Sequence, residues 1–163
     1  MSKALPSALP SASEVRDRCL CLHAQRVARA LARRFDEALR PHDLTSGQFS
    51  LLTALSGPQP PTVSEAADLL AMDRSTVTAA LKPLARRGLV LVDSDPADGR
   101  VKRPRLTEAG CAVLARAGAA WRIAHDALDR ELGAPTEAPA ALRTLSTRLH
   151  PHGQPRMKAS SAS

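Results

Sequence analysis

Two helix-start signals, separated by one short helix, constrain what this chain can fold into more than any other feature. Thr62 and Glu65 have the spacing of a capping box, and VSEAADLL follows directly. Asp73 comes almost immediately after that helix and can cap a second one, which Gly88 ends as a left-handed stop. A short helix, a tight turn and a second helix in this order predict a helix-turn-helix.

The pattern changes from helix to strand after Gly88. LVLV has strand character, DSDPADG is turn material, and RVKRPRL alternates enough to return as the partner strand of a basic hairpin. A helix-turn-helix followed by such a hairpin is the winged-helix arrangement. Its second helix enters the major groove of DNA, and its hairpin reaches the neighbouring backbone or minor groove.

Amphipathic helices are expected on both sides of this lobe. They cover residues 13–40, 45–55 and 108–132 and a last segment that carries Leu142, Leu145 and Leu149. The long apolar faces of the first and the last two exceed what one small lobe can cover, so they predict a dimer interface. The expected fold class is mainly α, a winged helix-turn-helix with a small β-hairpin wing and a helical dimerisation scaffold.

The same reading divides the chain into segments. It predicts a disordered tail over residues 1–12, a dimerisation helix over 13–43, a winged helix-turn-helix lobe over 44–107, dimerisation helices over 108–150 and a second disordered tail over 151–163. Thr45 and Gln48 give the helix that opens the lobe a capping box of its own.

The charge balance favours a polyanionic partner. The formal net charge is +7 and the sequence pI is about 10.3, values that alone do not separate nucleic acid from an anionic membrane. No stretch approaches the roughly 18 apolar residues of a membrane span, and the N-terminal apolar run is too short for a signal peptide. We therefore expect a cytoplasmic protein that does not bind membranes, with its three cysteines as thiols.

Small polar and basic groups gather where a winged helix meets DNA. The first turns of the second helix carry Arg74, Ser75, Thr76 and Thr78. Such short hydroxyl and basic side chains can approach bases and phosphates closely. The alternatives are an ordinary capped helix start and, for the hairpin, a solvated charged face. Pro83 lies beyond this surface, and its missing N–H predicts a kink or a loosened turn near Ala79.

DRSTVTAALKPLARRGLV, followed by DPADGR and then RLTEAG, resembles the MarR family of bacterial transcriptional regulators over residues 44–110. The resemblance implies a homodimer that binds a pseudo-palindromic DNA operator and represses promoters until a small ligand or an oxidant alters the spacing of its lobes. It also implies that Asp98 orients Arg100 for the minor groove. The candidate DNA-binding residues are Ser64, Arg74, Ser75, Thr76, Thr78, Lys82, Asp98, Arg100, Lys102 and Arg103.

The resemblance also implies an effector cleft between the dimer scaffold and the DNA-binding lobe. Trp121 and His125, one helical turn apart, are candidates to line it against a small aromatic or phenolic effector. His23 and Arg26 complete the candidate set. Core packing of Trp121 is the alternative.

Cys19 and Cys21 make an oxidant-sensing repressor of the same fold the alternative function. A cation such as His23 or Arg26 would favour a reactive thiolate at Cys19. Cys21 falls on the apolar stripe of its helix, about where the resemblance places the reactive cysteine of peroxide-sensing members. Those sensors hold the thiol with tyrosine hydroxyls, and this chain has no tyrosine. Buried packing of Cys21 therefore competes with sensing, and Cys111 is expected to be structural.

Neither a cofactor nor enzyme chemistry is expected. Cys19, Cys21 and His23 cannot converge on one metal ion from a single helix. No nucleophile elbow, phosphate loop, HExxH or paired-carboxylate pattern appears. A winged helix that serves only as a protein-interaction module is a further alternative, although such a module has no need for basic residues on both the second helix and the hairpin.

Overall fold

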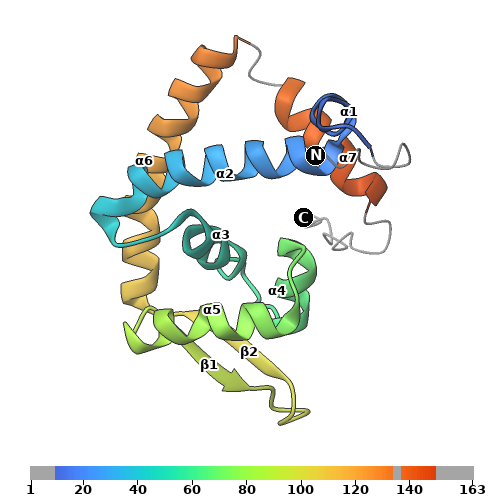
Figure 1. Ribbon diagram of the computed structural model, residues 1–163. Coiled ribbons are helices and arrows are strands. Elements are labelled where there is room, and N and C mark those ends of the chain that lie inside the picture. The colour runs from blue at the N-terminus through green and yellow to red at the C-terminus, as the bar shows by residue number, and fades with distance from the viewer. Residues whose placement is uncertain (1–9, 134–136, 150–163) are drawn as a thin grey trace, which may run out of the picture.

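The computed structural model describes residues 10–133 and 137–149, which form a mostly helical chain with one two-stranded antiparallel hairpin (Figure 1). The predicted mainly α fold class with a small hairpin is confirmed. The elements run in the order α1 (Ala12–Arg18), α2 (Leu20–Leu39), a 3-10 turn η1 (Arg40–His42), α3 (Ser46–Ala54), α4 (Val63–Leu70), α5 (Arg74–Arg86), β1 (Val90–Ser94), β2 (Lys102–Leu106), α6 (Glu108–Leu132) and α7 (Glu137–Leu149).

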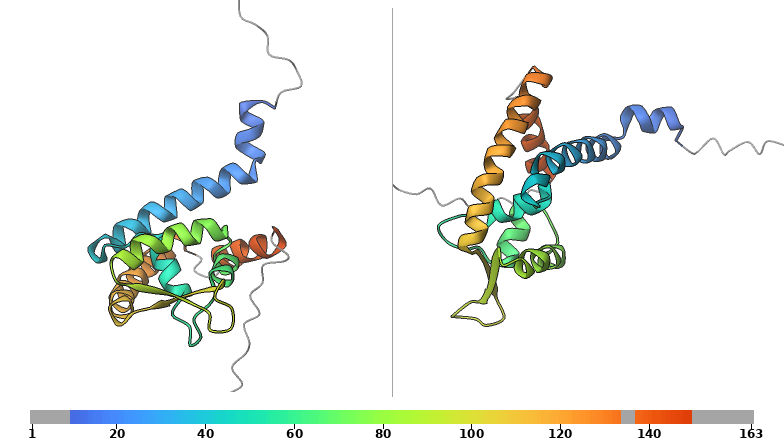
Figure 2. Two further views of the ribbon diagram at one scale, coloured as in Figure 1. Left: turned by 90° about the horizontal axis from the view of Figure 1, so that it is seen from below. Right: turned by 90° about the vertical axis from the view of Figure 1, so that its left-hand side faces the viewer.

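The hairpin projects beyond the helices at one end of the molecule (Figure 1). Helix α2 crosses above α3, α6 runs along one side of the molecule, and α5 lies at the end where the hairpin projects (Figure 1). Helix α1 and the first half of α2 extend away from the rest of the chain (Figure 2). Among the described helices, none combines the length and apolarity that crossing a membrane requires.

The core lies where α3, α4, α5 and the hairpin meet the second half of α2 and the middle of α6. The largest fully buried side chains are Leu39, Leu52, Val77, Leu84, Val90 and Pro104. Each fully buried Leu or Val contributes about 1.5–3 kcal/mol relative to an exposed one. These residues come from α2, α3, α5 and both strands, so the core fixes the positions of α5 and the hairpin relative to each other.

Both capping boxes and the glycine stop that the sequence predicts are formed. Thr45 with Gln48 and Thr62 with Glu65 each make both hydrogen bonds of a capping box, at the starts of α3 and α4. Gly88 has a φ of +68°, the left-handed conformation that follows α5. Thr62 and Gly88 therefore bound the helix-turn-helix, and Thr45 starts the helix that precedes it.

The first long helix was predicted without the break that it contains. Ser11 caps α1 ahead of Ala12, a residue assigned to the N-terminal tail, and the remaining predicted tail residues 1–9 and 151–163 lie outside the described residues. Cys19 then interrupts the helix with an extended ψ of 98°. Its sulfur accepts the N–H of Leu22 over 3.4 Å, so a thiol takes the place of the hydroxyl that usually caps a helix.

Two predictions about α5 are also wrong in detail. Asp73 occupies the N-cap position, but its side chain makes no capping hydrogen bond. The helix continues through Pro83 without the expected loosened turn (Figure 1). Ala79, whose carbonyl has no N–H partner at Pro83, is an exposed residue of the helix.

A close junction joins α6 to the start of the hairpin. The Thr107 hydroxyl donates to the carbonyl of Gly88 over 2.7 Å, and the Thr107 N–H donates to the carbonyl of Leu89 over 3.1 Å. Gly110 is buried against the same Leu89 carbonyl, and a Cβ at Gly110 would overlap its oxygen. The first turn of α6 and the start of β1 are therefore held together without a flexible joint.

Candidate nucleic-acid interface

Helix α5 divides its side chains between the core and the solvent. Val77, Leu81 and Leu84 are buried in the lobe and fix which side of the helix faces outward. The exposed residues of α5 include Arg74, Ser75, Thr76, Thr78 and Lys82. Ser64, in the first turn of α4, is exposed as well. A polar and basic helix face held by apolar anchors is the form in which a recognition helix presents its side chains.

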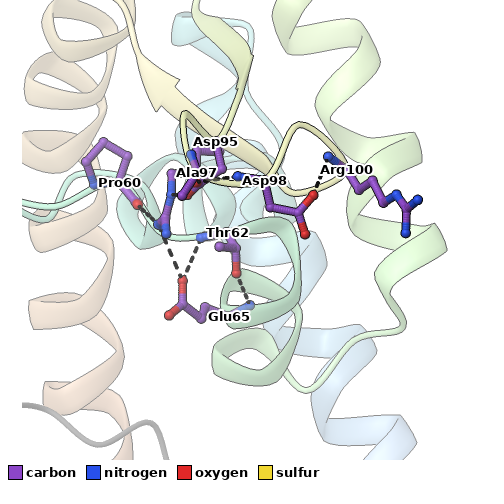
Figure 3. A network of polar contacts seen from close by, with 8 residues as sticks. Pro60, Thr62, Glu65, Asp95, Ala97, Asp98 and Arg100 are labelled. Carbon is purple, nitrogen blue, oxygen red and sulfur yellow. Dashed lines mark hydrogen bonds and ion pairs between the residues drawn. The ribbon is translucent and has the colours of Figure 1, made fainter.

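The tip of the hairpin carries an exposed arginine on an ordered backbone. The Asp98 carboxylate accepts the backbone N–H of Arg100 over 2.9 Å. The Arg100 side chain points away from this loop (Figure 3). Asp98 therefore orders the backbone on which Arg100 stands, and the guanidinium itself is exposed.

A second network ties the base of the wing to the segment before α4. The Arg103 guanidinium donates to Asp95 Oδ2 over 2.5 Å and to the Pro60 carbonyl over 3.1 Å. Asp95 also accepts the N–H of Ala97 over 2.8 Å, and Figure 3 shows Asp95, Ala97 and Pro60 drawn together at this point. The hydrogen bond from Arg103 is the largest cause that lowers the pKa of the Asp95 carboxyl. Three chain segments are therefore joined through one guanidinium.

Glu65 takes part in both the helix cap and this network. Its carboxylate accepts the N–H of Thr62 over 2.7 Å and lies 3.9 Å from an Arg103 nitrogen. The pKa of Glu65 is lowered, chiefly by the backbone hydrogen bond from Thr62. Sequence reasoning missed the anchoring role of Arg103, because the alternation in RVKRPRL does not tell which basic side chain turns toward protein acceptors.

The other cations gather in a groove between α5 and the hairpin. The groove has a volume of about 230 Å³, and Arg74, Lys82 and Lys102 lie on its walls. Lys102 Nζ donates to the Ser94 hydroxyl over 2.7 Å. Within the described residues, none of these three cations forms an ion pair with a carboxylate. Their charge is available to an anion, and a groove lined by one sign of charge suits the phosphate backbone of a nucleic acid.

A second, more apolar cavity lies between α2, α3, α6 and α7. It has a volume of about 520 Å³, and both Trp121 and His125 line it. The Trp121 and His125 ring centroids are 4.2 Å apart, and Phe35 lies 4.6 Å from the His125 ring. Phe49 stacks on Trp121 with centroids 5.9 Å apart. The cavity therefore has one aromatic wall built from three helices.

The other two effector candidates lie apart from this cavity. His23 and Arg26 are exposed on α2, and the lining of the cavity begins at Val27. The single chain does not bring them together with Trp121 and His125, because α2 extends past the body of the lobe at this point (Figure 2).

The three cysteines are free thiols. Cys19 is half-buried, and Cys21 and Cys111 are exposed. The expectation that Cys21 packs in the core is therefore wrong, because the chain itself does not cover this part of the apolar stripe of α2. Cys111 likewise fills no place in the core. Across the described ranges, no three His, Cys, Asp or Glu side chains are grouped as a metal ion would require.

Comparison with known proteins was made by sequence and by fold. The sequence model of the MarR family matches residues 44–102. A search of curated proteins found no significant match. The DNA complex of the M. tuberculosis transcriptional regulator MosR is 34% identical, with a TM-score of 0.75 over 82% of this chain and 98% of that chain.

Two further structures extend this similarity. The transcriptional repressor CouR of Rhodococcus jostii RHA1, bound to a 23-mer DNA duplex, is 28% identical, with a TM-score of 0.72 over 86% of this chain and 99% of that chain. A probable transcriptional regulator from Pseudomonas aeruginosa is 28% identical, with a TM-score of 0.69 over 82% of this chain and 98% of that chain.

Proposed function

The chain belongs to the MarR family of winged-helix transcriptional regulators, which are not enzymes, and from this premise we propose that it binds operator DNA as a homodimer and represses transcription until an effector weakens that binding. The observation that carries the proposal is the joint placement of the exposed face of α5, the groove of unpaired cations and the projecting Arg100. MosR and CouR, both similar over most of this chain, are solved with DNA.

In the proposed complex α5 enters the major groove. Its first turns bring Arg74, Ser75 and Thr76 toward base edges, with Thr78 one turn further along. Ser64, Lys82 and Lys102 contact phosphates, and Arg100 enters the neighbouring minor groove. Arg103, a candidate contact from sequence, is assigned instead to holding the wing, because its guanidinium is bound to Asp95 and to the Pro60 carbonyl.

The proposed homodimer uses the helices that the lobe leaves uncovered. None of the described residues of α1 and α7 is buried. The exposed large apolar side chains of α1, α2, α6 and α7 are Val15, Leu20, Val27, Ile123, Leu132, Leu142, Leu145 and Leu149. The proposed dimer covers these exposed apolar side chains. A second copy supplies an equivalent face and places two recognition helices about one DNA turn apart.

The apolar cavity is the proposed effector site. Its walls offer flat aromatic surfaces at Trp121 and Phe49 and polar groups at His125 and Asp129. No lysine or arginine is among the described residues that line it. A small aromatic or phenolic effector without a strong negative charge fits this chemistry, because its ring can stack on the aromatic side chains and its hydroxyl can donate to Asp129 or His125.

The effector site is coupled to the DNA-binding face through α6. Trp121 and His125 lie on the same helix whose first turn is fixed to the hairpin by Thr107 and Gly110. An effector that changes the position of α6 therefore moves the wing as well. A protein-interaction module without DNA binding is the competing function, and the unpaired cations on both α5 and the hairpin disfavour it.

The proposal is tested by titrating the protein against a labelled duplex taken from the DNA upstream of its own gene. We expect specific binding that survives excess unrelated duplex and that falls steeply with salt. The double variant Arg74→Ala with Lys82→Ala should lose at most about 1–3 kcal/mol of operator-binding free energy for each lost contact. The control variant Arg122→Ala, which removes an exposed arginine of α6, should bind like the parent. Equal binding by both variants would remove α5 from the interface.

A further inference from the structure

We propose that a further cavity, between the end of α3, strand β2 and the first turns of α6, binds a small aliphatic carboxylate. The cavity has a volume of about 480 Å³, within the range of about 300–1,000 Å³ that is typical of small-molecule sites. It shares no lining residue with the groove of cations or with the apolar cavity that contains Trp121. The binding of a ligand here therefore does not depend on the proposed operator and effector sites.

The walls of this cavity are aliphatic. Leu55 at the end of α3, Leu106 at the end of β2 and Leu114 of α6 line it, and Pro58 and Pro60 of the α3–α4 loop complete its apolar wall. No aromatic side chain is among the described lining residues, in contrast to the aromatic wall of the proposed effector site. A hydrocarbon chain therefore gains apolar contact here, whereas a ring gains no stacking partner.

The charge in this cavity is positive. Arg105 lines it, and no carboxylate is among the described lining residues. Arg105 donates through Nε to Asp93 Oδ2 over 2.7 Å and makes no other hydrogen bond to a described residue, so the N–H groups of its two terminal nitrogens can bind a ligand. The proposed effector site has the opposite chemistry, since Asp129 lines it and no described lysine or arginine does. A carboxylate is therefore favoured beside Arg105 and disfavoured in the other cavity.

Contacts outside the cavity hold its walls in place. The Arg103 guanidinium donates to the Pro60 carbonyl over 3.1 Å and so ties the α3–α4 loop to β2. Thr107 and Gly110 hold the first turn of α6 against the residues that precede and start β1. A ligand therefore enters a site whose walls are already positioned, and little ordering opposes its binding.

The regulatory consequence rests on the proposed function. Pro60 is a wall of the cavity, and its carbonyl accepts the hydrogen bond that anchors the wing, so one contact holds both the cavity and the wing. A ligand that binds this arrangement better than a loosened one shifts the population toward it. We therefore expect the ligand to strengthen operator binding by about fivefold, near the lower end of the usual coupling between sites.

Protection of Cys111 from alkylation tests the site without reference to DNA. The Cys111 thiol is exposed and lines the cavity, so a bound ligand covers it. The probe is octanoate, and the full chain is treated with N-ethylmaleimide and digested with trypsin. Cys111 then falls in the peptide LTEAGCAVLAR, whereas Cys19 and Cys21 fall together in CLCLHAQR and serve as the internal control.

We expect octanoate to slow the alkylation of LTEAGCAVLAR and to leave that of CLCLHAQR unchanged. Half-maximal protection should occur at roughly 1 mM or below, an affinity that a ligand of this size can reach. Octanamide, which has the same chain and no charge, should bind about fivefold more weakly, because a hydrogen bond to a charged acceptor contributes more than one to a neutral acceptor. Equal alkylation of Cys111 with and without octanoate overturns the proposal.

Variants locate the probe, with protection measured as the ratio of Cys111 alkylation rates without and with octanoate. Ala115→Phe fills the cavity from an exposed position of α6 and should abolish protection, whereas Ala112→Phe, an exposed position that does not line the cavity, should retain it. Arg105→Gln should remove the preference for octanoate over octanamide, and Arg122→Gln, which removes an exposed arginine elsewhere on α6, should keep it. Protection that survives Ala115→Phe would place octanoate outside the cavity and contradict the proposal.

Operator binding is measured as a separate step. An operator affinity that stays the same or falls in saturating octanoate, while Cys111 remains protected, overturns the regulatory consequence but not the site. Absence of operator binding by the ligand-free protein counts against the proposed function and leaves the alkylation test unaffected.

Discussion

Replacing Arg100 with alanine should change how steeply DNA binding depends on salt, whereas removing the anchor at Arg103 should not. The exposed Arg100 side chain is free to neutralise DNA charge, and a proposed dimer presents two of them. Each cation withdrawn from duplex DNA lowers the slope of log affinity against log salt by about 0.9, so the dimer should lose about 1.8. The affinity should fall by about 1–3 kcal/mol per wing.

The Arg103 anchor is best removed together with its partner. Arg103→Ala combined with Asp95→Ala leaves the net charge of the wing unchanged but breaks the tie to the Pro60 carbonyl. We expect weaker binding, because the wing loses its fixed position, with a salt slope close to that of the parent. Arg103 acts here as a support for Arg100.

The assay is fluorescence anisotropy of a labelled operator duplex between about 50 and 200 mM salt. Arg122→Ala controls for the loss of one exposed positive charge per chain elsewhere. A slope in the Arg103 double variant that falls as far as in Arg100→Ala would show that Arg103 contacts DNA. An unchanged slope and affinity in Arg100→Ala would remove the wing tip from the interface.

Three further predictions follow from the packing, the lowered pKa values and the aromatic wall. Gly110→Ala should lower the free energy of unfolding by about 1–3 kcal/mol in a denaturant titration, because the added Cβ overlaps the Leu89 carbonyl. An unchanged free energy of unfolding would show that the contact between α6 and the start of β1 is not close-packed. Asp95 and Glu65 have lowered pKa values in the folded chain, so their stabilising effect is complete above about pH 4.5 and is lost as the pH falls through the lowered values. On acidification the thermal midpoint of the parent should therefore drop more than that of the double variant Asp95→Asn with Glu65→Gln. Parallel curves of thermal midpoint against pH would contradict this prediction. Trp121 is the only tryptophan, so phenolic ligands that enter the cavity should change its fluorescence and weaken operator binding; a fluorescence change without any loss of binding would separate the cavity from regulation.

The helix-turn-helix is predictable from sequence because its boundaries depend on local chemistry. The capping boxes at Thr45 and Thr62 and the left-handed Gly88 need only a few neighbouring residues, and each forms as its spacing predicts. The strand pairing follows from the turn between two short strands. Arg74 and Lys82 of α5 and Arg100 and Lys102 of the wing are exposed where the pattern puts them.

The features that sequence reasoning missed depend on partners far along the chain or on rare uses of a residue. The break at Cys19 escaped notice because the apolar period continues across it and cysteine is not a usual capping residue. Arg103 donates a hydrogen bond to the carbonyl of Pro60, a residue 43 positions earlier that no local sequence pattern pairs with it. Cys21 lies on an apolar stripe that the single chain leaves uncovered, so periodicity alone suggested burial.

The central claim is that two copies of this chain present α5 and the wing to one DNA duplex. Mass photometry or sedimentation of the protein with an operator duplex of about 25 base pairs tests it most directly, since sites one turn apart need about that length. We predict a complex that contains two 17.3 kDa chains on one duplex and that is lost when α7 leucines Leu142 and Leu145 are replaced by aspartate. A stable complex with one chain per duplex, or no complex with any DNA from the neighbourhood of the gene, would contradict the account.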